Sequence, residues 1–122
     1  MIRLATSSES EILSLPVIAK EEKISAGYLE KIFSKLKKAK LIKARLGVSG
    51  GYILAQAPRD ITVLAIITAL EDNFSPFHCS SKSGKIYCKS NCRCDASGGF
   101  LMVEEAIRKT LKNIKLSDLL KN

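Results

Sequence analysis

A helical stripe followed at once by a glycine-rich turn constrains this chain more than any other feature. Residues 26–40 contain apolar side chains at spacings of three and four, typical of an amphipathic helix: Tyr28, Leu29, Ile32, Phe33 and Leu36. Ser25 is its predicted N-cap. A shorter helix is predicted within residues 11–22, with Ser14 as N-cap and Pro16 in the first turn. Two short helices joined by a tight turn form a helix-turn-helix pattern.

A wing is predicted directly after the second helix. Leu41–Ile42 and Tyr52–Ala55 have the composition of short strands, and the glycine-rich residues 47–51 suit the turn between them. Thr62 is then the predicted N-cap of a helix over residues 63–72, whose nearly continuous apolar character predicts burial on most sides. Residues 1–10 are polar and weakly patterned.

The C-terminal part begins with a predicted loop at 73–99. A last helix is predicted over residues 99–114, with an apolar stripe formed by Phe100, Val103, Ile107, Leu111 and Ile114. A second copy of this helix or the chain's own core are the alternative partners for that stripe. The expected fold class is mainly α with a small β wing, divided into a winged helix-turn-helix domain (1–73), a cysteine-rich sensor loop (74–98) and a dimerisation helix with its tail (99–122).

Charge is concentrated in one segment. The net charge is +8, and the segment from Lys23 to Arg59 contains nine basic residues and one acid, so it sums to +8 by itself. Such a segment is an electrostatic footprint for nucleic acid, with a solvated helix face as the alternative. The sequence shows no apolar run of about 20 residues and no signal-peptide core, which predicts a cytoplasmic protein without a membrane partner. With one histidine, no Ser/His/Asp set and no phosphate-binding loop, an enzyme is not expected.

All four cysteines lie within sixteen residues: Cys79, Cys88, Cys92 and Cys94. In a reducing compartment such a group favours a metal or redox role over structural disulfides. Basic residues lie between them (Lys82, Lys85, Lys89 and Arg93), and nearby cations stabilise thiolates and an anionic cluster. Thiolates are the ligands of iron–sulfur clusters, which we favour here. A zinc site, for which the spacing is poorer, and a cofactor-free thiol switch remain alternatives.

Three stretches resemble a known family: ISAGYLEKIFSKLKKAKLIKARLGVSGGYILA, ITVLAIITALED and NIKLSDLL. They resemble the bacterial winged-helix regulators that sense redox state or iron–sulfur clusters, including the repressors of iron–sulfur assembly and of cysteine metabolism. The resemblance covers residues 14–121. It implies a homodimer, expected to be a repressor, that binds a palindromic operator in double-stranded DNA through its second helix and wing. It also implies a 2Fe–2S or 4Fe–4S cluster in the cysteine loop whose loss or redox change alters DNA affinity.

The sequence departs from that family in three places. Only thirteen residues precede Ser14, so the family's long N-terminal helix is expected to be shortened here. The wing tip reads LGVSGGY, with Leu46 where relatives carry an arginine. Relatives commonly have three cysteines, which Cys79, Cys88 and Cys94 reproduce. The fourth ligand is then Cys92, His78, an N-terminal acid or solvent; Ser97 stands where one relative has a histidine ligand.

The predicted DNA contacts fall on the second helix and the wing. Base edges are assigned to the first turn, phosphates to the lysines, and further contacts to the wing: Ser25, Ala26, Tyr28, Glu30; Lys31, Lys35, Lys38, Lys43; Arg45 and Ser49. Tyr28 is also a candidate core residue, and Glu30 is either a specificity element or a solvated charge. Two other classes of function compete with DNA binding, namely a small electron-transfer protein and a winged-helix module that binds a protein.

Overall fold

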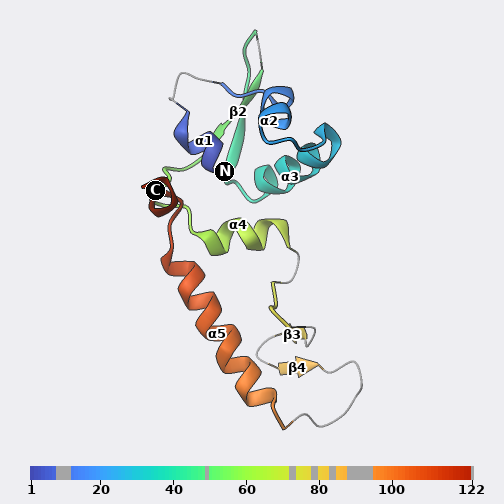
Figure 1. Ribbon diagram of the computed structural model, residues 1–122, viewed down its shortest axis with the longest axis vertical. Coiled ribbons are helices and arrows are strands. Elements are labelled where there is room, and N and C mark those ends of the chain that lie inside the picture. The colour runs from blue at the N-terminus through green and yellow to red at the C-terminus, as the bar shows by residue number, and fades with distance from the viewer. Residues whose placement is uncertain are drawn as a thin grey trace.

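The molecule consists of a head of short helices with a small sheet, and a long helix that extends away from the head (Figure 1). The computed structural model describes residues 1–7, 12–48, 50–71, 74–77, 80–82, 85–87 and 95–121. None of the helices in these ranges is both long enough and apolar enough to cross a bilayer.

The helix-turn-helix is formed by α2 (Leu15–Glu21) and α3 (Ala26–Lys38). Ser25 caps α3, since its hydroxyl oxygen accepts a hydrogen bond from the Tyr28 backbone N–H at 3.3 Å. The stripe predicted from the sequence is present, because α3 buries Leu29, Phe33 and Leu36. The two predicted helices are confirmed, and Ser14 and Ser25 occupy their N-cap positions, although the Ser14 side chain makes no cap hydrogen bond.

The wing pairs β1 (Ile42–Arg45) with β2 (Gly51–Leu54) in an antiparallel hairpin. The backbone at Leu13 pairs with the other edge of β2 in a single antiparallel bridge, in which the Tyr52 N–H donates to the Leu13 carbonyl at 3.0 Å. Gly51 permits this approach, because a Cβ there would lie 2.6 Å from that carbonyl oxygen. On the other side, the Tyr52 ring meets the Phe33 ring edge-on, with centroids 4.9 Å apart, so the wing is packed onto α3.

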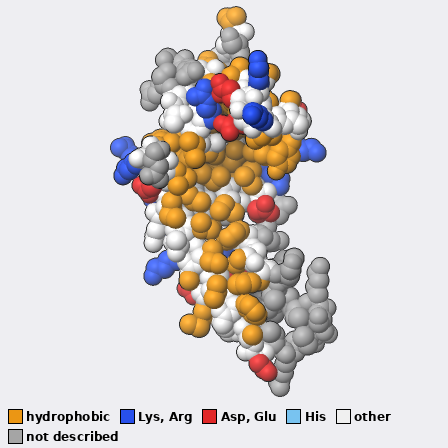
Figure 2. Space-filling model, in the orientation of Figure 1, with side chains coloured by type: hydrophobic (Ala, Val, Ile, Leu, Met, Phe, Trp, Pro, Cys, Tyr) orange, Lys and Arg blue, Asp and Glu red, His pale blue; other side chains and the backbone are white. Residues whose placement is uncertain are grey.

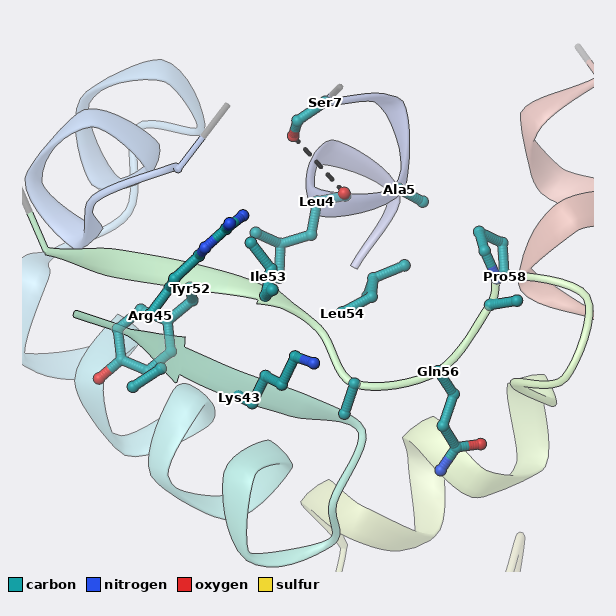
Figure 3. Close-up of a pocket in the computed structure, with 13 residues that line it drawn as sticks. Leu4, Ala5, Ser7, Lys43, Arg45, Tyr52, Ile53, Leu54, Gln56 and Pro58 are labelled. Atoms are coloured by element: carbon teal, nitrogen blue, oxygen red, sulfur yellow. Dashed lines mark hydrogen bonds between the residues drawn. The ribbon is translucent and has the colours of Figure 1, made fainter. Parts of the chain in front are cut away.

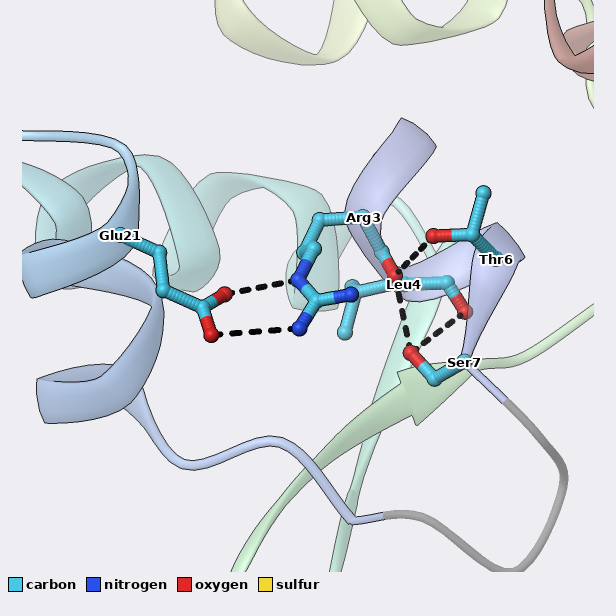
Figure 4. Close-up of polar contacts among 5 residues, drawn as sticks. All are labelled: Arg3, Leu4, Thr6, Ser7 and Glu21. Atoms are coloured by element: carbon cyan, nitrogen blue, oxygen red, sulfur yellow. Dashed lines mark hydrogen bonds and ion pairs between the residues drawn. The ribbon is translucent and has the colours of Figure 1, made fainter.

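A short helix that the sequence analysis did not predict opens the chain. Helix α1 (Ile2–Thr6) buries Leu4 and packs against β2 and against the C-terminal 3₁₀ turn η1 (Leu116–Leu120). Arg3 of α1 forms a two-point ion pair with Glu21 of α2, at 2.7 and 3.2 Å (Figure 4). Five residues are too few to show a helical period, so only tertiary packing reveals this element.

Helix α4 (Val63–Leu70) lies at the centre of the molecule, and the long helix α5 (Ser97–Asn113) extends from beside it away from the head (Figure 1). Thr62 caps α4 as predicted, with its hydroxyl accepting from the Ala65 N–H at 3.0 Å. Leu116 is fully buried where η1 meets the head, and its N–H donates to the Ile61 carbonyl at 2.8 Å. The end of the chain is thereby tied back to the beginning of α4.

Two sequence expectations for this region need correction. The segment 73–99 was expected to be loop, yet it contains a short antiparallel hairpin of β3 (Ser80–Lys82) and β4 (Lys85–Tyr87), and α5 starts at Ser97. The predicted burial of α4 on most sides is wrong within a single chain, because α4 has no fully buried residue. A run of apolar residues indicates a need for burial, but one chain does not supply enough covering surface.

Candidate nucleic-acid interface and cysteine-loop anchor

The first turn of α3 is exposed to solvent. Ser25, Ala26 and Glu30 all lie on the surface, and the Tyr28 side chain is 60% exposed. Exposure rules out the core position considered for Tyr28, since its ring does not enter the cluster formed by Leu29 and Phe33. The residues predicted to approach base edges are therefore free of the chain's own core and share one accessible end of the helix.

The lysines predicted to contact phosphates are placed differently from one another. Lys31 and Lys38 are exposed on α3. Lys35 is also on the surface, but its Nζ donates a hydrogen bond to the Leu70 carbonyl at 2.7 Å. That carbonyl belongs to the last turn of α4, where the helix dipole favours a cation. Lys35 thus connects α3 to the end of α4, a role that sequence spacing could not show.

The wing carries its cations on one side. Lys43 and Arg45 alternate with Ala44, whose strand partner Tyr52 packs on α3, so both cations occupy the sheet face turned away from that helix. They border a cavity of about 740 Å³ between the wing and α1 (Figure 3). Their phosphate contacts stay predictions, and Ser49 lies outside the described residues.

The segment that leads into the cysteines is held against α5. We call residues 74–77 the loop anchor. Arg108 donates from Nη2 to the Phe74 carbonyl at 2.5 Å, and its guanidinium lies 5.7 Å from the Phe74 ring centroid. The Phe77 ring meets Phe100 of α5 at a centroid distance of 4.8 Å. These contacts fix the chain two residues before Cys79.

A buried acid completes the anchor. Glu104 is 8% exposed, accepts a hydrogen bond from Arg108 Nε at 3.1 Å and one from the Ser75 hydroxyl at 3.4 Å. A buried carboxylate requires such partners, so the loop anchor and this pair of α5 residues stabilise each other. The i, i+4 spacing of Glu104 and Arg108 was visible in the sequence, whereas their partners in the loop anchor were not.

The cysteines and the neighbouring His78 lie outside the described residues, so their mutual geometry is not described. Within the part of the chain that is described, no three His, Cys, Asp or Glu side chains are grouped as metal ligands would be. The fixed points on either side are nevertheless clear: the loop anchor ends two residues before Cys79, and α5 begins three residues after Cys94.

The helix-turn-helix, its packed wing and the long C-terminal helix define a winged-helix protein of the kind that regulates transcription. The sequence matches the Rrf2 family, described as iron-dependent transcriptional regulators, over residues 1–122, and the chain belongs to this family. The regulator IscR of Serratia proteamaculans is 33% identical over 122 residues, which are all of this chain and 73% of that protein. The fold expected from the resemblance is confirmed, and the naming of the relatives as regulators agrees with the expectation that this is not an enzyme.

Solved structures give the same result. The chain resembles T. potens IscR with a TM-score of 0.75 and 34% identity, covering 98% of this chain and 77% of that one. It resembles CymR, the global cysteine regulator of B. subtilis, with a TM-score of 0.78 and 29% identity, covering 98% and 86% of the two chains. An oxidized form of Staphylococcus aureus CymR has a TM-score of 0.77 at 26% identity and covers 99% and 86%.

Proposed function

We propose that this protein is a homodimeric transcriptional repressor that binds a palindromic operator, and that the state of its cysteine loop sets its affinity for DNA. The observation that carries this proposal is the pair of contacts on either side of the α4–loop junction. Lys35 of α3 binds the Leu70 carbonyl, and Arg108 of α5 binds the Phe74 carbonyl four residues later. The segment that enters the cysteine loop therefore contacts both α3, the proposed recognition helix, and α5.

DNA binding is supported by charge and exposure together. The basic segment from Lys23 to Arg59 contains α3 and the wing, and the first turn of α3 is accessible. An electron-transfer role requires neither feature. Binding that weakens steeply with salt is the expected result, because each phosphate contact releases counterions. Salt-independent binding to proteins, with no affinity for duplex DNA, would instead favour the protein-interaction alternative.

A second copy of the chain is the proposed cover for the exposed apolar surface of α4 and α5. Hydrophobic side chains form a broad band over these two helices (Figure 2). Met102 is 75% exposed on α5, Val103 is also exposed, and α4 is only partly covered. Burial of this band between two copies would relate their two recognition helices by a two-fold axis. A palindromic operator is expected because its two half-sites have the same symmetry.

The dimer can be tested by sedimentation of the double variant Met102→Glu and Val103→Glu. Two buried charges at the interface would shift the mass toward that of one chain and abolish tight binding to a palindrome. The matched control is Lys109→Glu, which adds negative charge to an exposed position of the same helix. An unchanged mass in the first variant would contradict the proposed interface.

The proposed cofactor of the loop is an iron–sulfur cluster held by Cys79, Cys88 and Cys94, with Cys92 as the candidate fourth ligand. The cysteine number, the surrounding cations and membership of a family described as iron-dependent support it. A cofactor-free thiol switch is the second candidate. It is favoured by the similarity to CymR, because one of the similar CymR structures is an oxidized form. Each mechanism would change the order of the loop and so act on the contacts of Lys35 and Arg108.

Anaerobic purification followed by iron and sulfide counts and visible absorption decides between these candidates. Matching iron and sulfide with absorbance between about 320 and 460 nm establishes a cluster. Its removal should then change the affinity for an operator selected from random duplexes. A colourless, iron-free protein after anaerobic reconstitution would overturn the cluster, and affinity that is equal before and after removal would overturn its regulatory role.

A further inference from the structure

The wing tip exposes two aliphatic side chains that no part of the described chain covers. Leu46 is 98% exposed, and Val48 is fully exposed. The turn that carries them is closed by a hydrogen bond from the Gly50 N–H to the Gly47 carbonyl at 3.0 Å, with Gly50 at φ +26°. The backbones of Gly47 and Gly50 therefore meet at the tip, whereas the exposed side chains of Leu46 and Val48 lack any folding role.

The reach of the hairpin determines which surface these side chains can meet. Ile42 is buried at the base of β1, against the core that holds α3. Leu46 lies four residues further along, which corresponds to roughly 13 Å of extended chain, and Val48 follows it in the turn. Half a helical turn of B-form DNA, about 17 Å, separates a major groove from the adjacent minor groove. With α3 in the major groove, the tip reaches the next minor groove.

We propose that Leu46 and Val48 form an apolar wing tip that lies against the floor of a DNA minor groove and favours A·T over G·C pairs there. This inference rests on the proposed function. The chemistry follows from the groove, because a G·C pair exposes the guanine N2 amino group, a donor that an aliphatic side chain would leave without a partner. An A·T pair has no such group, and apolar side chains are among those that proteins place in minor grooves.

Continuity with the basic surface argues for DNA as the occupant. The tip belongs to the same hairpin as Lys43 and Arg45, and this hairpin follows the lysine-bearing α3 directly in the chain. An apolar protein surface would be a poorer occupant, because it offers no negative charge to the cations Lys43 and Arg45 beside the tip. The combination of a cationic stem and an aliphatic end suits phosphates beside a groove whose floor presents base edges.

Two synthetic duplexes isolate the predicted preference. Poly(dI-dC) and poly(dG-dC) present nearly the same major groove, but only the second has the N2 amino group in its minor groove. We expect the intact protein to bind poly(dI-dC) about fivefold more tightly, which is near the lower end of the discrimination seen for base contacts. In the double variant Leu46→Ser, Val48→Ser this ratio should fall to about one, with an unchanged salt slope because no charge is lost.

Lys31→Gln serves as the matched control, because Lys31 is exposed on α3 and distant from the wing tip in the chain. It should weaken binding to both polymers equally, lower the salt slope and leave their ratio unchanged. A ratio near one in the intact protein, or a ratio that survives in the serine variant, would overturn the proposal.

Two other outcomes assign the tip to a different occupant. Unaltered binding of both polymers by the serine variant would indicate a protein contact, and a changed sedimentation mass without DNA would indicate a contact between copies of the chain; either overturns the inference. Failure of the proposed function is distinguishable, since it would abolish salt-dependent binding to both polymers in the intact protein.

Discussion

Replacing Lys35 by glutamine tests whether this residue connects α3 to α4 or contacts a phosphate. The Lys35 Nζ donates to the Leu70 carbonyl at 2.7 Å, at the C-terminal end of α4. A hydrogen bond from a charged donor contributes about 1.5–3 kcal/mol when shielded from water. Because this lysine is exposed, solvent competes for both partners, and we expect the variant to lose about 1 kcal/mol.

That loss corresponds to a measurable change in melting temperature. An unfolding entropy of about 2.1 cal/mol/K per residue gives roughly 0.26 kcal/mol/K for 122 residues, so 1 kcal/mol lowers Tm by about 4 °C. A phosphate contact would show itself differently, as a decrease of about 0.9 in the salt slope of DNA binding. Calorimetry at fixed protein concentration and a salt titration of DNA affinity therefore distinguish the two roles.

Lys31→Gln is the comparison variant, with the same charge removed one turn earlier on α3. We expect it to lower the salt slope and leave Tm within about 1 °C, since surface substitutions without partners change stability little. The reasoning is refuted if Lys35→Gln retains the original Tm and loses as much salt slope as Lys31→Gln. Lys35 would then be a phosphate contact that also happens to lie near α4.

Three further predictions concern the anchor, the core and pH. Arg108→Met should raise the rate of chymotrypsin cleavage after Phe74 about tenfold, since the loop anchor loses the donor to its carbonyl and buried Glu104 loses its ion partner. Leu116→Ala should cost about 3 kcal/mol, or roughly 12 °C in Tm, because this side chain is fully buried. Arg3 hydrogen-bonds to Glu21 and lowers the pKa of that carboxyl below 4.5, so its stabilising contribution is present above pH 4.5 and is lost as pH falls through the lowered pKa.

Controls for these three use neighbouring positions. Lys109→Met removes an exposed charge beside Arg108, and it should leave the cleavage rate unchanged. Leu119→Ala truncates a partly exposed residue of η1 and should cost less than half as much as Leu116→Ala. Arg3→Gln should remove the part of the acid sensitivity that Glu21 contributes; an identical pH profile in this variant would show that the ion pair has no role in it.

Local sequence was sufficient for the elements that have a strong period or a clear cap. Thr62 and Ser25 mark the starts of α4 and α3 within one residue, because a hydroxyl that satisfies a free N–H acts over three residues. The apolar spacing of α3 likewise predicted that Leu29, Phe33 and Leu36 face the core, but it also included Tyr28, which is exposed. The cysteine grouping and the basic segment are also properties of the sequence itself, and they direct attention to the loop and to α3 before any coordinates are considered.

Tertiary structure decided the features that depend on distant residues. Helix α1 forms because Leu4 finds a place between β2 and η1, more than one hundred residues apart in the chain from its partner on η1. Lys35 is assigned to the Leu70 carbonyl, and Glu104 and Arg108 to the loop anchor, by proximity that no spacing rule contains. The charge and spacing of residues in the sequence indicate which kinds of contact a side chain can make, whereas the folded chain determines which partner lies close enough for that contact to form.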